Sequence, residues 1–181
     1  MEKLETYMKH RPQVQTGDFF GSTNPMALGR GINAIQWFWS KDAESIYSHS
    51  GIITGEDGTT LEALWTVKSG TLFTDYAGDK VIIARYMDVS PARIRDELRA
   101  LREQHEGNIY PFWRLGMHLF PPLAKVTWFD RLVCSELVAK YLYMIGARHP
   151  QYAGTSPDVL ADEWHRWKNF EIVFEGELQI L

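Results

Sequence analysis

Polar and hydrophobic positions alternate, or apolar residues gather into short runs, in five parts of the chain, and these parts predict β-strands. Two of them flank Gly55-Glu56-Asp57-Gly58, a turn signal, and so predict a β-hairpin. A third is β-branched through its centre, at Val81-Ile82-Ile83, as strands prefer. The predicted strands cover residues 13–21, 48–54, 60–67, 80–86 and 171–174.

Apolar residues at intervals of three and four predict helices. Ser90-Pro91 supplies an N-cap and a first-turn proline for one helix, and Thr155-Ser156-Pro157-Asp158 caps the last one in the same way. The predicted helices cover residues 32–42, 90–107, 132–145 and 155–164. Strands and helices in this order predict an α+β fold with an antiparallel sheet.

The length of 181 residues predicts a single domain, residues 1–181, with a substantial core. Residues 108–130 are rich in prolines and aromatic residues and show no clear period. They are too apolar to stay solvated, so we expect a packed, irregular insert rather than a disordered linker.

Composition and charge exclude several classes of protein. The net charge is −4, and the densest basic run, residues 93–103, is interleaved with acidic residues, so we expect no nucleic-acid partner. No stretch reaches the roughly 18 apolar residues of a membrane span, and the first ten residues lack the apolar region of a secretory signal. A single cysteine forms no intrachain disulfide. We therefore expect a cytoplasmic protein without stable membrane insertion.

The single cysteine, Cys134, stands where the helix over 132–145 begins. The positive end of the helix dipole and the free backbone N–H groups there favour the thiolate, which is the nucleophilic form. His49 enters the first hairpin strand, and Glu62 lies on the returning strand. The alternative is structural, because a lone cysteine on an amphipathic helix is often a buried core residue, and His49 can be a core histidine.

The hairpin register decides whether His49 and Glu62 can cooperate. If Thr54 pairs with Thr59 across the turn, Gly51 faces Glu62. His49 and Glu62 are then diagonal neighbours on one face, with Cα atoms roughly 7–8 Å apart. A slip of one residue would place them on opposite faces.

Such a trio suits nucleophilic catalysis. The imidazole takes the proton of the thiol and later delivers it to the leaving group, while the carboxylate fixes the imidazole tautomer. The backbone N–H of Cys134, in the first turn of its helix, is a natural oxyanion donor. We expect Asp18, by contrast, to end a turn.

The trio lies within short motifs, which are Gly17-Asp18-Phe19-Phe20, Ser48-His49-Ser50-Gly51-Ile52-Ile53, Leu61-Glu62-Ala63 and Val133-Cys134-Ser135-Glu136-Leu137-Val138. Their order resembles that of the circularly permuted, NlpC-like members of the papain-like cysteine hydrolases. The resemblance covers roughly residues 14 to 160. It implies a permuted papain-like fold, an antiparallel sheet or barrel packed against helices with the nucleophile at a helix N-terminus. It also implies Cys134 as nucleophile, His49 as base and Glu62 as the third polar residue.

This reading predicts a cysteine peptidase or amidase that works through a thioester acyl-enzyme on a small peptide, a cell-wall fragment or an acyl lipid. One alternative is a lipid-directed acyltransferase or thioesterase, with residues 108–130 as an acyl groove. Another is a non-catalytic binding module. The other five histidines lack the spacing of metal ligands, so we expect no metal and no cofactor. The oligomeric state is left open.

Overall fold

The computed structural model of the chain describes residues 11–23, 46–109, 132–148 and 155–179, and every structural statement below refers to these residues. The helix predicted at 32–42 lies outside them, as does the insert predicted at 108–130 except for residues 108 and 109.

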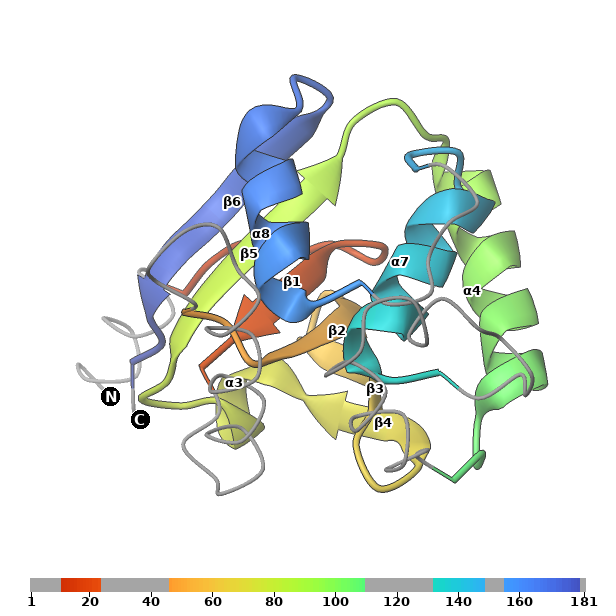
Figure 1. Cartoon of the computed structure of the whole chain (residues 1–181), viewed down its shortest axis with the longest axis horizontal. Coiled ribbons are helices and arrows are strands. Elements are labelled where there is room, and N and C mark those ends of the chain that lie inside the picture. Colours follow the sequence, from red (N-terminus) through yellow and green to blue (C-terminus); the bar gives the residue numbers. More distant parts are fainter. Residues whose placement is uncertain (1–10, 24–45, 110–131, 149–154, 180–181) are drawn as a thin grey trace.

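Six strands form one antiparallel sheet in the order β4-β3-β2-β1-β5-β6 (Figure 1). The mixed α+β architecture is therefore confirmed. The sheet is not closed into a barrel, so that part of the prediction is wrong: closure needs the two end strands to pair, and β4 and β6 lie at opposite edges. The strands are β1 (Phe19–Ser22), β2 (His49–Ile53), β3 (Thr59–Ala63), β4 (Val67–Thr71), β5 (Lys80–Tyr86) and β6 (Phe170–Glu177).

Helices cover one face of this sheet. Helix α7 (Cys134–Met144) packs on β2, and α8 (Pro157–Arg166) packs on β1 and β6, while α4 (Pro91–His105) lies outside against α7 (Figure 1). The caps are those predicted, since Ser90 accepts from the Arg93 N–H and Ser156 from the Val159 N–H, both at 3.3 Å. The short helix α3 (Leu72–Asp75) follows β4.

Strands β1, β2 and β5 have buried residues on both faces, because successive residues point to opposite sides. Phe19, Ile52 and Ile82 belong to a core cluster with the residues of α7 and α8. Phe20, Ile53 and Ile83 belong to a second cluster on the other side, with Leu72 and Tyr76 at the two ends of α3. Helices α7 and α8 therefore cover one layer of the core, and the short helix α3 covers the other.

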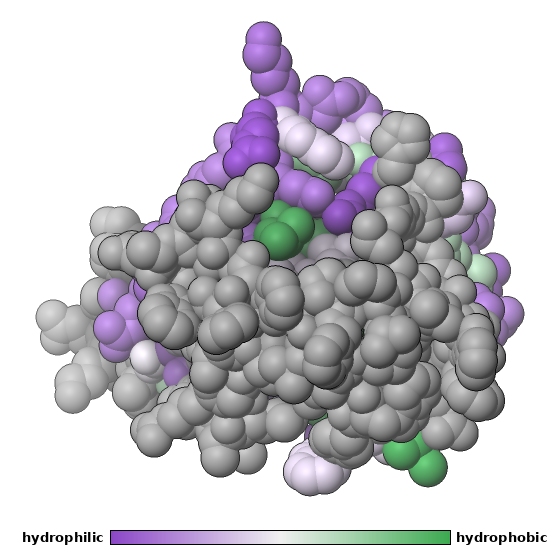
Figure 2. All heavy atoms as spheres, viewed as in Figure 1, coloured by the Kyte–Doolittle hydropathy of each residue, from purple (hydrophilic) through white to green (hydrophobic). Residues whose placement is uncertain are grey.

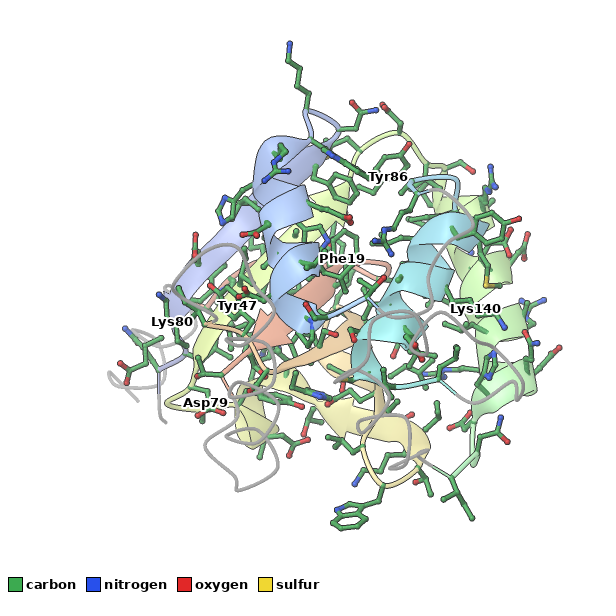
Figure 3. All side chains as sticks on the ribbon, viewed as in Figure 1. Phe19, Tyr47, Asp79, Lys80, Tyr86 and Lys140 are labelled. Atoms are coloured by element: carbon green, nitrogen blue, oxygen red, sulfur yellow. The ribbon has the colours of Figure 1, made fainter. Side chains whose placement is uncertain are left out.

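Two labelled residues in Figure 3 illustrate the helical layer. The ring of Phe19 lies beneath α8, with its centroid 4.9 Å from that of Trp164. Lys140 reaches from α7 toward α4, where its Nζ lies 2.7 Å from His105 Nε2 and 3.1 Å from Gln104 Oε1. An apolar contact thus fixes α8, and a polar contact links α4 to α7.

Several boundaries differ from those predicted. The strand predicted at 13–21 is reduced to β1, because Gly17 adopts a positive φ of 100° in the turn before it. The strand predicted at 60–67 divides into β3 and the start of β4, with Leu64 donating to the Thr66 carbonyl between them. Helix α3 was not predicted.

No helix among the described residues has both the length and the apolar character needed to cross a bilayer. In the space-filling view of Figure 2, the described atoms along the upper rim, where α8 ends and where β6 and α4 begin, are mostly hydrophilic.

Candidate active site

Cys134 is the first residue of α7, and its helix start is fixed by its neighbours. Val133, the N-cap, is extended, and its N–H donates to Glu136 Oε2 at 3.2 Å, which anchors the first turn. Cys134 is 4% exposed. The thiol is therefore held at the end of the helix where the dipole and the backbone N–H groups favour an anion.

His49, the first residue of β2, lies between the thiol and a carboxylate. Its side chain is hydrogen-bonded to that of Cys134, and its Nε2 lies 2.8 Å from Glu62 Oε2. Because Nε2 is occupied by Glu62, Nδ1 is the nitrogen left for the sulfur. His49 and Glu62 are 3% and 2% exposed. The structure thus brings together all three residues that the sequence singled out.

The hairpin register that allows this contact is the one predicted. Gly51 pairs with Glu62, and the Thr54 N–H donates to the Thr59 carbonyl at 2.7 Å. A Cβ on Gly51 would lie 2.6 Å from Phe20 Cε1 and 2.8 Å from Glu62 Cγ. The missing side chain is therefore what lets the Glu62 side chain cross its neighbour strand toward His49.

Glu62 has two further hydrogen-bond donors that the sequence reasoning missed. Thr60 Oγ donates to Oε1, and the Tyr76 hydroxyl donates to Oε2. Thr60 precedes Glu62 by two residues on the same strand and so shares its face, a signal that was available. Tyr76 follows α3, which no sequence pattern indicated.

Two backbone N–H groups, those of Ser50 and Ser135, donate to the Cys134 sulfur. Ser135 belongs to the first turn of α7, where amides have no partner within the helix. The Ser50 N–H points to the same side of β2 as that of Thr54, toward β3, but the pairing of β2 with β3 begins only at Gly51. Because the β2–β3 pairing does not extend to Ser50, its N–H has no partner on β3 and can donate to the Cys134 sulfur.

Charge in the site favours a thiolate–imidazolium pair. Burial alone would lower the pKa of His49, but hydrogen bonds and charge interactions with Cys134 and Glu62 raise it to about 10. Burial would raise the pKa of Cys134, yet His49 and the two amides lower it below its ordinary value. Burial also opposes ionisation of Glu62, whose pKa is nonetheless lowered, first by His49 and then by Thr60 and Tyr76.

Asp18 takes no part in this cluster. Its Oδ2 accepts from the Gln15 N–H at 2.8 Å, and Arg85 donates to both carboxylate oxygens at 2.7 and 2.9 Å. These bonds hold the turn before β1, as the sequence analysis predicted for this residue.

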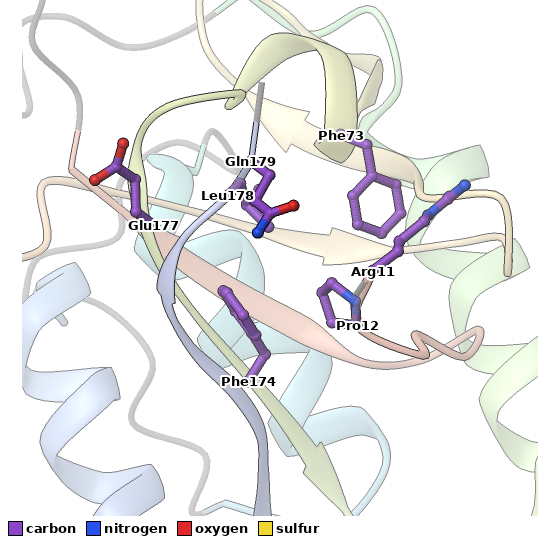
Figure 4. Close-up of a pocket in the computed structure, with 7 residues that line it drawn as sticks. All are labelled: Arg11, Pro12, Phe73, Phe174, Glu177, Leu178 and Gln179. Carbon is purple, nitrogen blue, oxygen red and sulfur yellow. The ribbon is translucent and has the colours of Figure 1, made fainter. Parts of the chain in front are cut away.

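A small pocket lies apart from the trio, beside α3 and the end of β6 (Figure 4). Its volume is about 60 Å³, and the guanidinium of Arg11, which lines it, lies 3.6 Å from the centroid of the Phe73 ring. None of Cys134, His49 and Glu62 lines this pocket.

The chain matches no protein-family model and no curated protein sequence. One solved structure with a similar fold is the crystal structure of metalloprotein yiiX from Escherichia coli O157:H7, DUF1105. The two are 21% identical over 92% of this chain and 89% of that one, with a TM-score of 0.54. At this identity the likeness extends to the fold alone.

These comparisons correct the family assignment made from the sequence. The inferred membership of the permuted NlpC-like, papain-like hydrolases is wrong, since no family model matches and the similar structure carries a different description. The assignment rested on motifs of three to six residues. Cysteine, histidine and carboxylate groups recur in this arrangement on unrelated folds, so the trio does not identify a family.

Proposed function

We propose that this protein is a cysteine hydrolase that cleaves an amide bond, of peptide or cell-wall type, through a thioester acyl-enzyme. The observation that carries the proposal is the buried imidazole of His49, hydrogen-bonded to the Cys134 thiol on one side and to Glu62 on the other. A cysteine that only fills space in the core does not need a hydrogen bond to a histidine that is itself paired with a carboxylate.

In the proposed reaction, the Cys134 thiolate attacks the substrate carbonyl carbon and forms a C–S bond. The backbone N–H of Cys134, in the first turn of α7, stabilises the oxyanion. The His49 imidazolium gives its proton to the leaving amine as the C–N bond breaks. Neutral His49 then takes a proton from water, which attacks the thioester and releases the acid and the thiolate. Glu62 stabilises the imidazolium and holds its orientation throughout.

A metal centre fits these residues poorly, although the similar structure is described as a metalloprotein. Metal ligands converge on one point, whereas here the imidazole is hydrogen-bonded to both the sulfur and the carboxylate and so lies between them. Within the described ranges, no group of three or more histidine, cysteine, aspartate or glutamate residues is placed to hold a metal ion.

The alternatives are less well supported. A lipid-directed acyltransferase or thioesterase was suggested by residues 108–130, nearly all of which lie outside the described residues. A non-catalytic binding module gives no reason for the contact between Cys134 and His49. The cytoplasmic location stays a prediction, as does the permuted papain-like description of the fold, in which the histidine strand precedes the cysteine helix.

Labelling with iodoacetamide, a probe small enough for a buried thiol, tests the activated pair. At pH 6 we expect rapid alkylation of Cys134 in the wild type and much slower alkylation in His49→Ala. His165→Ala is the control, because His165 is half-exposed and contacts Glu175 on β6 instead. Equal labelling of the wild type and His49→Ala would refute the proposal.

Acyl transfer is tested separately with p-nitrophenyl acetate. We expect an acetyl adduct on Cys134, detected by mass spectrometry, that hydrolyses in the wild type. Cys134→Ala loses the adduct and the turnover while its circular dichroism and melting transition remain. If Cys134→Ala unfolds instead, Cys134 is a core residue.

A further inference from the structure

Tyr76 makes a contact at the centre of the site that the trio does not account for. It is 7% exposed and ends α3, and its hydroxyl donates to Glu62 Oε2. The same oxygen lies 2.8 Å from His49 Nε2. One carboxylate oxygen therefore serves both the imidazole and the phenol.

The ring of Tyr76 also lies parallel to the imidazole of His49. Their centroids are 5.9 Å apart, with an angle of 11° between the planes. Phe20 packs against both rings at steeper angles, with centroids 5.1 Å from Tyr76 and 6.2 Å from His49. Two aromatic residues thus limit the rotation of the imidazole about its side-chain bonds.

Glu62 is held just as closely. Thr60 donates to Oε1, and a Cβ on Gly70 would lie 2.7 Å from that same atom. With Gly51 on the other neighbouring strand, the carboxylate lies between two glycines. A flexible glutamate side chain is therefore confined to one position, in which each oxygen has a donor.

We propose that Tyr76 is a positioning residue of the Cys134–His49–Glu62 site. Its hydroxyl keeps Glu62 Oε2 on His49 Nε2, and its ring fixes the plane of the imidazole. This inference rests on the proposed function, since it gives Tyr76 a part in preparing the thiolate for attack.

The charged groups around Glu62 influence the pH at which its carboxylate takes up a proton. His49 faces it from β2 with Cys134 behind, and Lys68 on β4 is its exposed partner in the strand register. Asp75 of α3 adds a second negative charge close by, since its Oδ2 and Glu62 Oε1 both approach Gly70.

Burial has the largest single influence on Glu62, and it favours the protonated acid, which the donors oppose. Without the Tyr76 hydroxyl, Glu62 takes up a proton at a higher pH. A protonated Glu62 no longer stabilises the imidazolium, so the Cys134 thiolate is lost at that higher pH as well.

The experiment is the rate of iodoacetamide labelling of Cys134 as a function of pH. The acid midpoint is the pH at which the labelling rate falls to half of its plateau value. In Tyr76→Phe, which keeps the ring, we expect this midpoint to move to higher pH. At pH values below the midpoint, labelling should slow about tenfold, the usual effect of losing one hydrogen bond to a charged group. The rate on the plateau stays near that of the wild type. Tyr76→Leu, which also loses the ring, slows the plateau.

The control is Tyr141→Phe. It removes another buried tyrosine hydroxyl, one that donates to the Gly17 carbonyl at 3.2 Å, and it should leave the profile unchanged. A wild-type midpoint at the ordinary pKa of a thiol contradicts the proposed function, whatever Tyr76 does. A low wild-type midpoint that Tyr76→Phe leaves unchanged or lowers further overturns only the role of Tyr76. If Tyr76→Phe does not fold, Thr60→Val, which removes the other donor to Glu62, must raise the midpoint, and an unshifted profile overturns the proposal.

Discussion

His49 is the residue on which the proposed chemistry depends, because it is hydrogen-bonded to both other members of the trio. Its two ring nitrogens have different partners, so the tautomer and the orientation are set by the same contacts. Glu62 supplies the negative charge that keeps the imidazole protonated, at the cost of burying a carboxylate. That cost is offset by its three hydrogen-bond donors, His49, Thr60 and Tyr76.

Glu62→Gln tests this charge at nearly constant shape. The neutral amide cannot stabilise an imidazolium, so the pKa of His49 falls and that of Cys134 rises. We expect labelling at pH 6 to slow by about tenfold or more, the loss of a charged hydrogen bond of about 1.5–3 kcal/mol. The measurement is the alkylation rate beside Glu171→Gln, an exposed carboxylate on β6 that should have no effect. Equal rates in the two variants would contradict the role given to Glu62.

At the level of elements, the hairpin β2–β3 and the start of α7 make the site. The hairpin register could be predicted from the sequence, because the turn residues and the residues that pair lie close together in the chain. The sequence pattern also placed the helix start within two residues of Cys134. Strand β4 could not be predicted, because its residues after Val67 are largely exposed and do not alternate. Helix α3 could not be predicted either, because it is one turn long and shows no period. Tyr76 was missed with them, and the family was misassigned because short motifs fit unrelated folds.

Gly51→Ala tests how closely these elements pack. The new Cβ must displace Phe20 and Glu62, both less than 3 Å from its ideal position. We expect a loss of about 1–3 kcal/mol in the free energy of unfolding, as for other overpacked cores, together with slower labelling of Cys134.

The matched control is Gly21→Ala on β1. Its Cβ points to the other face, where the nearest atom is Ile82 Cγ2 at 3.2 Å. It should cost less and leave labelling unchanged. Denaturant unfolding of both variants measures the two losses of unfolding free energy. Equal losses would contradict the closer packing proposed around Gly51.

For the whole molecule, the ion pair links stability to pH. The pKa of His49 is raised from 6.5 to about 10, so its contribution is complete below 6.5 and is lost as the pH rises to about 10. The pKa of Cys134 is lowered from 9.0, so its contribution is complete above 9.0 and is lost as the pH falls through the folded value. Between 6.5 and 9.0 the two dependences cancel, because folding only moves a proton from sulfur to nitrogen.

We therefore expect a plateau in the difference in unfolding free energy between the wild type and Cys134→Ser/His49→Gln. The difference should be flat from pH 6.5 to 9.0 and decline on both sides by up to about 1.4 kcal/mol per pH unit, the value for one proton. Protonation of Glu62, whose pKa is lowered, steepens the acid side. Denaturant titrations over this pH range measure it, and a net slope through the neutral region would show that the native Cys134–His49 pair binds more or fewer than one proton, which would contradict the pKa shifts of the two groups.

The two sides of the sheet contribute different parts of the site. The imidazole contacts Phe20 and Tyr76 of the core cluster around α3, whereas Cys134 belongs to the cluster under α7 and α8. The proposed acid–base groups and the proposed nucleophile thus come from separate layers of the core, on the two sides of the sheet. Protein design can therefore replace Cys134 with another nucleophile by changing only the helical layer, because the contacts that hold His49 and Glu62 lie on the other side of the sheet.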